Sequence, residues 1–274
     1  MGYKIVEREQ WSEKVFMMKV VAPDIAKHRK AGNFIIFRLD EVGERIPLTI
    51  ADADTNDGTI MIVTQDVGYS TAKLMELQVG DEIMDVIGPL GQPTHIEKHD
   101  GIVLCVGGGV GIAPLHPIAQ AHHNNGNKVV SILGARDKSL IIMEDMMKKI
   151  SEETLICTDN GSYGEKGLVT DMIKRVYEKG EKISEVIAIG PAIMMKFVAK
   201  LTKEYNLPTT VSLNPIMIDG TGMCGCCRVL VGKETKFACV EGPEFDGHLV
   251  DFDLLMKRQA MYKKEEHECN LRLS

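Results

Sequence analysis

The sequence of 274 residues lacks three features that would place it in a large class of proteins. It has no block of basic residues, and its 39 Asp and Glu exceed its 32 Lys and Arg, which gives a net charge of −7. Because nucleic acids and anionic membranes bind cations that displace their counterions, neither partner is expected. The longest apolar stretch, residues 101–114, is rich in glycine and too short to cross a bilayer.

A secretory signal is also missing. The N-terminal segment MGYKIVEREQWSEK is charged throughout and has no apolar core. We therefore expect a soluble, cytoplasmic protein. With 44% hydrophobic and 26% charged residues, the composition is that of a globular protein and excludes wholesale disorder. The length predicts about two domains, at roughly 150 residues each.

The seven cysteines leave long stretches of the chain empty, which argues against a disulfide framework. Cys105, Cys157 and Cys269 are scattered, whereas the other four fall within residues 224–239. In a reducing compartment, a tight group of cysteines indicates a metal site more often than disulfides.

Residues 1–98 have the pattern of an antiparallel β domain. Short runs of strand character alternate with turn signals such as Ala31-Gly32-Asn33, which predicts a small barrel. A short helix is expected over residues 71–77, capped by Ser70. The predicted strands cover residues 3–8, 14–21, 34–39, 46–50, 59–64 and 82–87.

Residues 99–213 change to alternating strands and helices, which predicts a parallel sheet covered by helices on both faces. Residues 214–250 follow as a small module with the cysteine group, and residues 251–274 as a charged tail with a helix over 252–267. Met194 and Met195 are expected to pack in a helical core. Strands are predicted over 102–106, 129–133, 155–158, 186–189 and 210–213, and helices over 113–123, 140–150, 169–179 and 192–205.

A glycine-rich turn follows the first parallel strand. Glycines without a Cβ let the backbone approach a pyrophosphate, and the next helix offers free N–H groups and the positive end of its dipole. The alternative is a tight turn that only requires positive φ angles. The strand–turn–helix context favours nucleotide binding. The turn consists of Gly107, Gly108, Gly109, Val110, Gly111, Ile112, Ala113 and Pro114.

Two shorter motifs precede this turn. Arg45-Ile46-Pro47-Leu48-Thr49 opens a barrel strand, where an arginine can grip a phosphate and a threonine can hydrogen-bond a flat heterocycle. Gly68-Tyr69-Ser70-Thr71 opens the short helix and offers a second anion-binding N-terminus. Each motif alone is also typical of an ordinary surface strand or helix cap, and only their combination is informative.

The cysteine group has the spacing of an iron–sulfur site. Plant-type [2Fe–2S] proteins space their ligands C-x4-C-x2-C…C, and Cys224, Cys227 and Cys239 supply three of these positions. Asp219 stands at the first position, so we assign it as the fourth ligand, with Cys226 as the rival because its thiolate is the softer donor. A structural zinc site with four thiolates typically has two C-x2-C pairs, and the sequence has only one.

Taken together, RxPLT, GYST, GGGVGIAP, GP-x-x-MM (residues 190–195) and the cysteine loop resemble the ferredoxin–NADP⁺ reductase superfamily. The resemblance is to its branch of FAD/[2Fe–2S] subunits and covers almost the whole chain. That branch includes the dihydroorotate dehydrogenase electron-transfer subunit and the small subunit of NADH-dependent reduced ferredoxin:NADP⁺ oxidoreductase, also known as a sulfide dehydrogenase subunit. It implies a multidomain β + α/β fold, with an antiparallel FAD-binding β-barrel, a Rossmann-like NAD(P)-binding domain and a small [2Fe–2S] module.

The resemblance also implies roles for single residues. Thr49 is expected near the flavin N5, and Leu48 replaces an aromatic residue often found there. The expected FAD contacts are Arg45, Pro47, Leu48, Thr49, Val63 and Thr64, with Gly68, Ser70 and Thr71 at the pyrophosphate. The expected nicotinamide dinucleotide contacts are residues 107–114 with Gly134, Arg136, Asp159, Gly190 and Pro191.

The aspartate at 219 and the extension after Cys239 make the chain more similar to the ferredoxin:NADP⁺ oxidoreductase subunit. That likeness implies a larger partner with a second FAD and [4Fe–4S] clusters, a heterodimer that bifurcates electrons, and ferredoxin reached through the complex. NADH would exchange hydride with FAD, and the [2Fe–2S] cluster would carry single electrons. No catalytic acid or base is assigned, because the flavin carries the chemistry.

Three questions stay open at this point. Dihydroorotate oxidation is an alternative function for the same subunit type. A zinc-stabilised regulatory module that binds nucleotides without redox chemistry is another. The choice between NADH and NADPH is also open, because Arg136 could meet a 2′-phosphate or be a surface residue.

Overall fold

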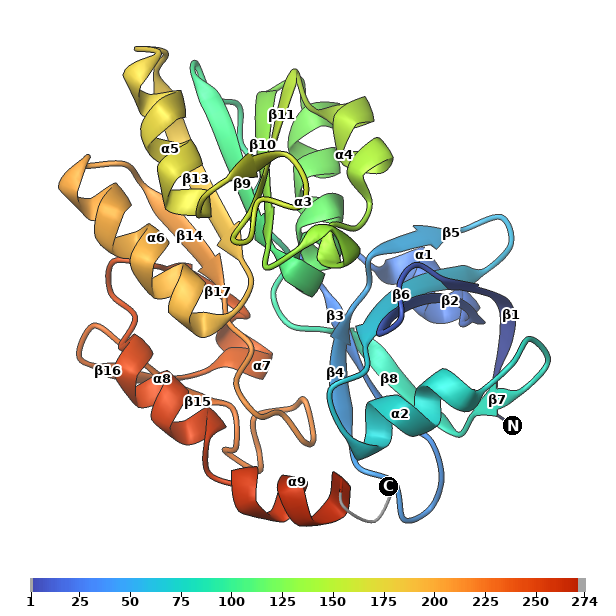
Figure 1. Cartoon of the computed structure of the whole chain (residues 1–274). Helices are drawn as coiled ribbons and strands as arrows, with labels where there is room; N and C mark the ends of the chain where they lie inside the picture. The colour runs from blue at the N-terminus through green and yellow to red at the C-terminus, as the bar shows by residue number, and fades with distance from the viewer. Residues whose placement is uncertain (1, 271–274) are drawn as a thin grey trace.

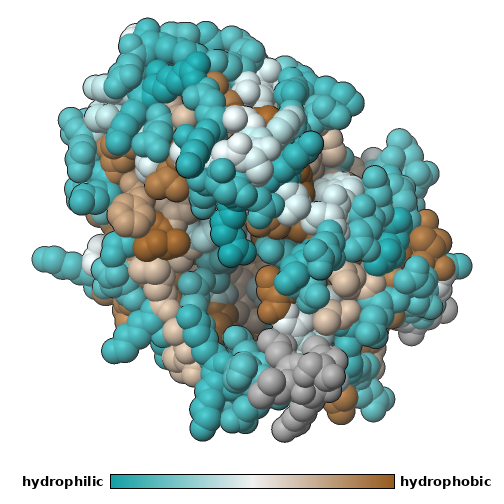
Figure 2. Space-filling view, in the orientation of Figure 1, coloured by the Kyte–Doolittle hydropathy of each residue, from teal (hydrophilic) through white to brown (hydrophobic). Residues whose placement is uncertain are grey.

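The computed structural model describes residues 2–270 and confirms the predicted fold class. An antiparallel β domain, a parallel α/β domain and a C-terminal module surround a central hollow (Figure 1; Figure 2). Among the described residues, no helix is long and apolar enough to cross a membrane.

The β domain is built from two antiparallel sheets around one core. Their strand orders are β5-β6-β2-β1-β7 and β4-β3-β8. Ile5, Phe16 and Phe37 are fully buried between the sheets. The bounds are β1 Tyr3–Gln10, β2 Val15–Val21, α1 Pro23–His28, β3 Phe34–Arg38, β4 Ile46–Thr49, β5 Asp52–Asp54, β6 Thr59–Gln65, α2 Tyr69–Glu76, β7 Glu82–Ile83 and β8 Asp85–Leu90.

The α/β domain has a sheet of order β12-β11-β10-β9-β13-β14-β17, parallel up to β14. Every residue of β9 is buried because successive side chains enter opposite cores. Leu104 packs with α5 and α6, and Cys105 packs with α3 and α4. The bounds are β9 Ile102–Gly108, η1 Gly109–Gly111, α3 Ile112–Asn124, β10 Lys128–Ala135, η2 Lys138–Leu140, α4 Glu144–Ile150, β11 Glu153–Thr158, β12 Glu165–Lys166, α5 Val169–Glu178, β13 Ile183–Ile189, α6 Ala192–Glu204 and β14 Thr209–Ser212.

The C-terminal module is attached to this sheet and does not stand apart from it. Its last strand β17 pairs antiparallel with β14, through Val211 and Phe245 among others. The module is therefore held in a fixed place beside the carboxyl ends of the parallel strands. The bounds are β15 Arg228–Val231, β16 Glu234–Phe237, α7 Ala238–Glu241, β17 Glu244–Asp246, α8 Phe252–Gln259 and α9 Lys263–Asn270.

The segment between the β domain and the α/β domain is fastened by hydrogen bonds. The Gln92 side chain donates to the Val240 carbonyl oxygen at 2.7 Å, and its backbone N–H donates to the Gly242 carbonyl oxygen at 2.6 Å. The Thr94 hydroxyl donates to the Glu244 carboxylate at 2.6 Å. These bonds join the linker to the C-terminal module.

Three helix predictions are wrong in extent. The helix expected over residues 71–77 with Ser70 as its cap spans Tyr69–Glu76, and its N-cap is Gly68. The helix expected over residues 140–150 begins only at Glu144, because Met143 takes a left-handed conformation with φ of 53°. The tail helix expected over residues 252–267 is broken after Gln259 and resumes at Lys263. Residues 271–274 of the predicted tail lie outside the described part of the chain.

Candidate functional site

A cavity of about 1070 Å³ opens between the β domain and the carboxyl ends of β9, β10, β11 and β13. Residues predicted separately for two ligands line this one space, so the structure brings the two predicted sites together. The predicted residues that line it are Pro47, Leu48, Thr49, Val63, Gly108, Gly109, Val110, Gly111, Ala113, Pro114, Gly134, Arg136, Asp159, Gly190 and Pro191.

The glycine-rich turn forms the floor of the cavity where β9 passes into α3. A Cβ at Gly111 would lie 2.5 Å from the Ile189 carbonyl oxygen and 2.7 Å from the Gly190 Cα. Gly109 adopts a φ of 55°. Glycine is needed at position 111 because two backbones approach closely there. Since glycines carry no Cβ, the turn also lets a ligand phosphate come close to the N–H groups at the helix N-terminus.

The barrel side of the cavity is formed by β4 and β6. Val63 lines the cavity, whereas Thr64 does not, because neighbouring side chains of a strand point to opposite faces. The Thr64 side chain is 2% exposed, and its hydroxyl has no hydrogen-bond partner in the described structure. The structure therefore places Thr64 behind the cavity wall.

The helix α2 begins at a turn that is held by side-chain hydrogen bonds. The Thr71 hydroxyl oxygen accepts hydrogen bonds from the Val67 and Gly68 N–H groups, each at 3.0 Å. The Ser70 hydroxyl donates to the Glu44 carboxylate, which brings the loop before Arg45 to this helix end. Arg45 is exposed and forms no ion pair within residues 2–270. Arg45, Thr64, Gly68, Ser70, Thr71, Gly107 and Ile112 do not line the main cavity.

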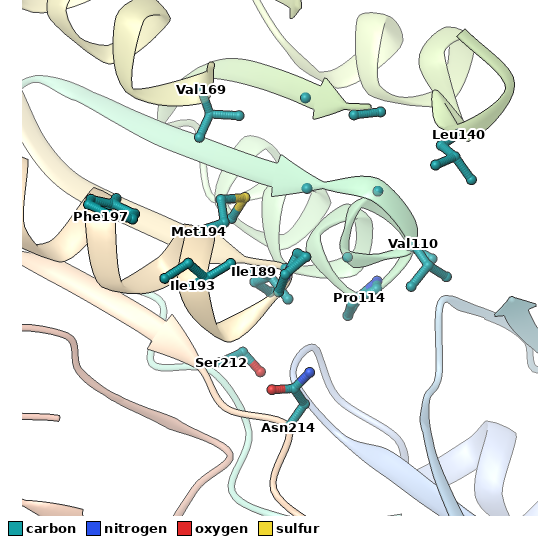
Figure 3. Close-up of a pocket in the computed structure, with 18 of the residues that line it drawn as sticks. Val110, Pro114, Leu140, Val169, Ile189, Ile193, Met194, Phe197, Ser212 and Asn214 are labelled. Atoms are coloured by element: carbon teal, nitrogen blue, oxygen red, sulfur yellow. The ribbon is translucent and has the colours of Figure 1, made fainter. Parts of the chain in front are cut away.

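Helix α6 supplies a wall that the sequence did not predict. Ile193, Met194 and Phe197 line the cavity, and Phe197 is 53% exposed (Figure 3). The core placement is right for Met195, which is fully buried, and in part for Met194, which packs against the same core and also lines the cavity. The spacing of these apolar residues along α6 is the signal that could have found them, but the same spacing also describes a core face. Leu168, the N-cap of α5, and Lys174, in the middle of α5, extend this wall.

The cysteine loop brings two thiols into contact. The Cys227 and Cys239 sulfur atoms are 3.1 Å apart, and both residues are at most 2% exposed. Burial raises the pKa of the Cys239 thiol to about 12, with the Cys227 thiol as a further cause. Cys224 is exposed, and Cys226 is partly buried. Within residues 2–270, no three His, Cys, Asp or Glu side chains are arranged to hold a single metal ion.

Asp219 organises the same loop through its carboxylate. Its Oδ1 accepts a hydrogen bond from the Thr221 N–H at 2.5 Å, and its Oδ2 accepts one from the Cys224 N–H at 2.6 Å. These bonds, the Thr221 one first, lower the pKa of Asp219 to about 2. Three thiols and one ionised carboxylate on a glycine-rich loop are a donor set that fits a [2Fe–2S] cluster.

The cysteine loop also rests against the β domain. A Cβ at Gly220 would lie 2.6 Å from the Leu90 Cδ1 and 3.0 Å from the Ile36 Cδ1. Ile36 belongs to β3 and Leu90 to β8. Strand β3 pairs with β8 on one side and with β4 on the other. The loop is therefore packed directly on the sheet whose other strand, β4, lines the cavity.

Comparison with protein families gives two matches. Residues 105–200 match the oxidoreductase NAD-binding domain, and residues 214–251 match the iron–sulfur cluster binding domain of dihydroorotate dehydrogenase B. The matched families favour the iron–sulfur interpretation of the cysteine loop over the zinc alternative.

Similar proteins cover nearly the whole chain. The chain is 48% identical, over 96% of its length and 92% of the relative's, to the Thermotoga maritima "dihydroorotate dehydrogenase B (NAD(+)), electron transfer subunit homolog". The chain belongs to the family of dihydroorotate dehydrogenase B electron-transfer subunits and their homologues. It is therefore a subunit of an NAD(P)H-dependent oxidoreductase.

Two further relatives extend this family. A Clostridium beijerinckii protein encoded in the adh 3′ region is 51% identical over 98% of this chain and 93% of its own. A solved structure of the NADH-dependent reduced ferredoxin–NADP oxidoreductase, from work on flavin-based electron bifurcation, has a chain that is 46% identical. It superposes with a TM-score of 0.94 over 100% of this chain and 98% of that chain.

Proposed function

We propose that this chain is the FAD- and [2Fe–2S]-containing subunit of an electron-bifurcating NADH-dependent reduced ferredoxin:NADP⁺ oxidoreductase. The observation that carries the proposal is the single cavity that joins barrel residues 47–49 to the glycine-rich turn, with the cysteine loop packed on the adjoining strands. When bound, FAD accepts a hydride from a nicotinamide and passes electrons on singly to iron.

The chain's own contribution at the nicotinamide–flavin junction is positioning. Pro47, Leu48 and Thr49 form the barrel wall against which the flavin ring would lie, and Gly190 and Pro191 form the opposite rim. The lining is largely apolar, so it excludes water from the transferred hydride. No side-chain acid or base is needed, because hydride transfer moves no separate proton at this site.

Two helix N-termini would hold the two dinucleotides. The turn before α2, with Gly68, Ser70 and Thr71, would bind the FAD pyrophosphate, and Arg45 would neutralise part of its charge. The turn before α3 would bind the nicotinamide dinucleotide, with Gly134, Arg136 and Asp159 along the same rim.

We assign Asp219, Cys224, Cys227 and Cys239 as the cluster ligands. Cys226 lies between two ligands, and its sulfur is 4.0 Å from the Cys224 carbonyl oxygen. The matched variants D219A and C226S separate the two candidates. D219A is expected to change the EPR spectrum of the reduced cluster and to lower the iron content, while C226S leaves both unchanged. The reverse result would make Cys226 the fourth ligand.

The larger flavin and [4Fe–4S] subunit, ferredoxin as a reactant of the complex, and a cytoplasmic location are parts of the same proposal. The family supports a partner, because its members are electron-transfer subunits. The partner's identity can be found by purifying the chain from its native cells without oxygen and sequencing the proteins that remain attached.

The decisive experiment is the composition of the anaerobically purified protein. We expect about one FAD and two iron atoms per chain, no zinc, and rapid bleaching of the flavin absorption by NADH. A colourless preparation, or one that holds zinc instead of iron, would overturn the proposed function and leave the regulatory alternative.

Dihydroorotate oxidation is the second candidate, because the iron–sulfur module matches the dihydroorotate dehydrogenase B family. The native complex distinguishes the two. Reduction of NAD⁺ by dihydroorotate, with no exchange between NADPH and ferredoxin, would replace the first proposal with this one.

A further inference from the structure

The C-terminal end of α8 reaches the cysteine loop. The Arg258 Nη2 donates a hydrogen bond to the Cys226 carbonyl oxygen at 3.1 Å, and the arginine is partly buried there. Two apolar residues hold the helix in place, since Phe252 and Leu255 are 5% and 2% exposed in the core of the α/β domain. The Asp251 carboxylate caps the helix by accepting from the Leu254 N–H at 2.9 Å.

The charge of Arg258 is not balanced by a nearby acid. Within residues 2–270 it forms no ion pair with a carboxylate, and its hydrogen bond is to a backbone carbonyl. The preceding Lys257 is also free of ion pairs in this part of the chain, but it is exposed and its side chain forms no hydrogen bond there. The two neighbours thus carry the same charge, and of the two only Arg258 is hydrogen-bonded to the loop within residues 2–270.

We propose that Arg258 is a positioning residue for the cluster, which holds the loop at Cys226 and makes the cluster easier to reduce. This assignment rests on the proposed function, since it requires a [2Fe–2S] cluster on the loop. The residues matched to the iron–sulfur domain end at 251, so α8 and its arginine lie outside that domain. Through Arg258, the C-terminal extension that contains α8 would take part in electron transfer.

The physical reason is the charge of the cluster. Two ferric ions, two sulfides and four anionic ligands carry a total charge of about −2, which becomes about −3 when one electron is added. A cation nearby stabilises the more negative state to a greater degree. The guanidinium also polarises the peptide between Cys226 and the ligand Cys227, which strengthens the dipole of the Cys227 N–H beside the iron site.

The same helix end also reaches the main cavity. The Gln259 side chain donates to the Asn214 carbonyl oxygen at 2.8 Å and approaches its Oδ1 at 3.0 Å. Asn214 lines the cavity (Figure 3). Adjacent residues of α8 therefore contact the cysteine loop and the cavity wall, which fixes the loop relative to the cavity.

The test compares R258Q, R258K and the matched control K257Q in the full-length chain, purified anaerobically with any subunit that remains attached. Iron content, the EPR spectrum and the midpoint potential of the cluster are measured by redox titration. R258Q is expected to lower the equilibrium constant for reduction about tenfold, which is about 59 mV for one electron. K257Q is expected to keep the wild-type potential, and R258K to lie between R258Q and wild type.

Each outcome decides the proposal. Full iron with equal potentials in R258Q and K257Q would overturn it. If R258Q loses iron, the R258K variant decides between two outcomes. An R258K protein that retains iron at a potential near that of the wild type supports the assignment. An R258K protein that loses iron shows that Arg258 is purely structural and overturns the assignment. Wild-type protein without iron would instead overturn the proposed function, on which this assignment depends.

Discussion

At the scale of single residues, Gly111 in the glycine-rich turn is restrained by neighbouring backbone. A Cβ at this position meets the backbone of Ile189 and Gly190 at the end of β13, which cannot rotate away as a side chain can. At Gly108, in contrast, a Cβ meets the side chain of Met194, which can change its rotamer. An alanine should therefore be tolerated better at position 108 than at position 111.

This difference predicts that G111A is much more damaging than G108A. G111A should lower the free energy of unfolding by about 1–3 kcal/mol, since overpacking pushes β13 away, and should weaken NADH binding at least tenfold. G108A serves as the comparison, because a Cβ there meets first the flexible side chain of Met194. Urea unfolding and calorimetric titration with NADH measure both effects. Equal losses in G111A and G108A would contradict the difference between the two glycines.

Glu244 is a second residue with a measurable consequence. Burial, together with a smaller effect of the nearby Glu185, raises the pKa of its carboxyl to about 7, although the hydrogen bond from Thr94 acts in the opposite direction. Because this pKa lies above its unfolded value of 4.5, the folded state binds the proton more tightly. The carboxyl therefore favours folding below about pH 4.5, and this contribution is lost as the pH rises to about 7.

The substitution E244Q keeps the acceptor for the Thr94 hydroxyl and removes the charge. We expect E244Q to be more stable than the wild type at pH 8, by about 1–3 kcal/mol in the free energy of unfolding, and nearly equal at pH 4.5. Urea unfolding across this pH range provides the measurement. A difference that does not change with pH would show that the carboxyl titrates normally.

At the scale of elements, α8 depends on one apolar face. F252A should lower the free energy of unfolding by about 3–5 kcal/mol, because it empties a site in the core. L254A, on the exposed side of the same helix, should cost less than about 1 kcal/mol. Chemical unfolding of both variants tests this. Similar losses in the two would mean that α8 is not anchored through Phe252.

The elements also show what the sequence could predict. Strands with continuous apolar residues, such as β9, were predicted nearly to their ends, since burial on both faces leaves a clear pattern. The six-residue α1 was missed because it is too short to show a helical period. The break in the tail near Ala260 was missed because polar residues there continue a helical composition. The pairing of β17 with β14 is a long-range contact that no local pattern contains.

The same limits apply to the site. Glycines and prolines that shape turns were found from the sequence because their backbone requirements are local. Phe197 and Met194 were not, since an apolar residue on a helix looks the same whether it faces a core or a cavity. Thr64 was assigned to the cavity through a family likeness, and the alternation of strand β6 turns its side chain away.

At the scale of the whole molecule, FAD binding and folding are linked. If the flavin binds across the β domain and the cavity, FAD at 100 times its dissociation constant should add about 2.7 kcal/mol to the free energy of unfolding of the apoprotein. FMN lacks the second phosphate and the adenosine that α2 would hold. At the same concentration as FAD, it should therefore add less to the free energy of unfolding. Thermal unfolding with each flavin measures the difference. Equal stabilisation by FAD and FMN would contradict the assignment of the pyrophosphate site to α2.

The hydrogen bonds at Gln92 and Thr94 have a consequence for how the nucleotide enters and leaves. These bonds hold the linker against the C-terminal module, so a hinge motion between the β domain and the α/β domain would have to break them. We therefore expect coenzyme exchange to proceed by small movements of side chains at the mouth of the cavity. The amide hydrogens of Gln92 and Thr94, which donate to the Gly242 and Ala31 carbonyl oxygens, should accordingly exchange with deuterated solvent as slowly as those of the sheet, with or without NADH.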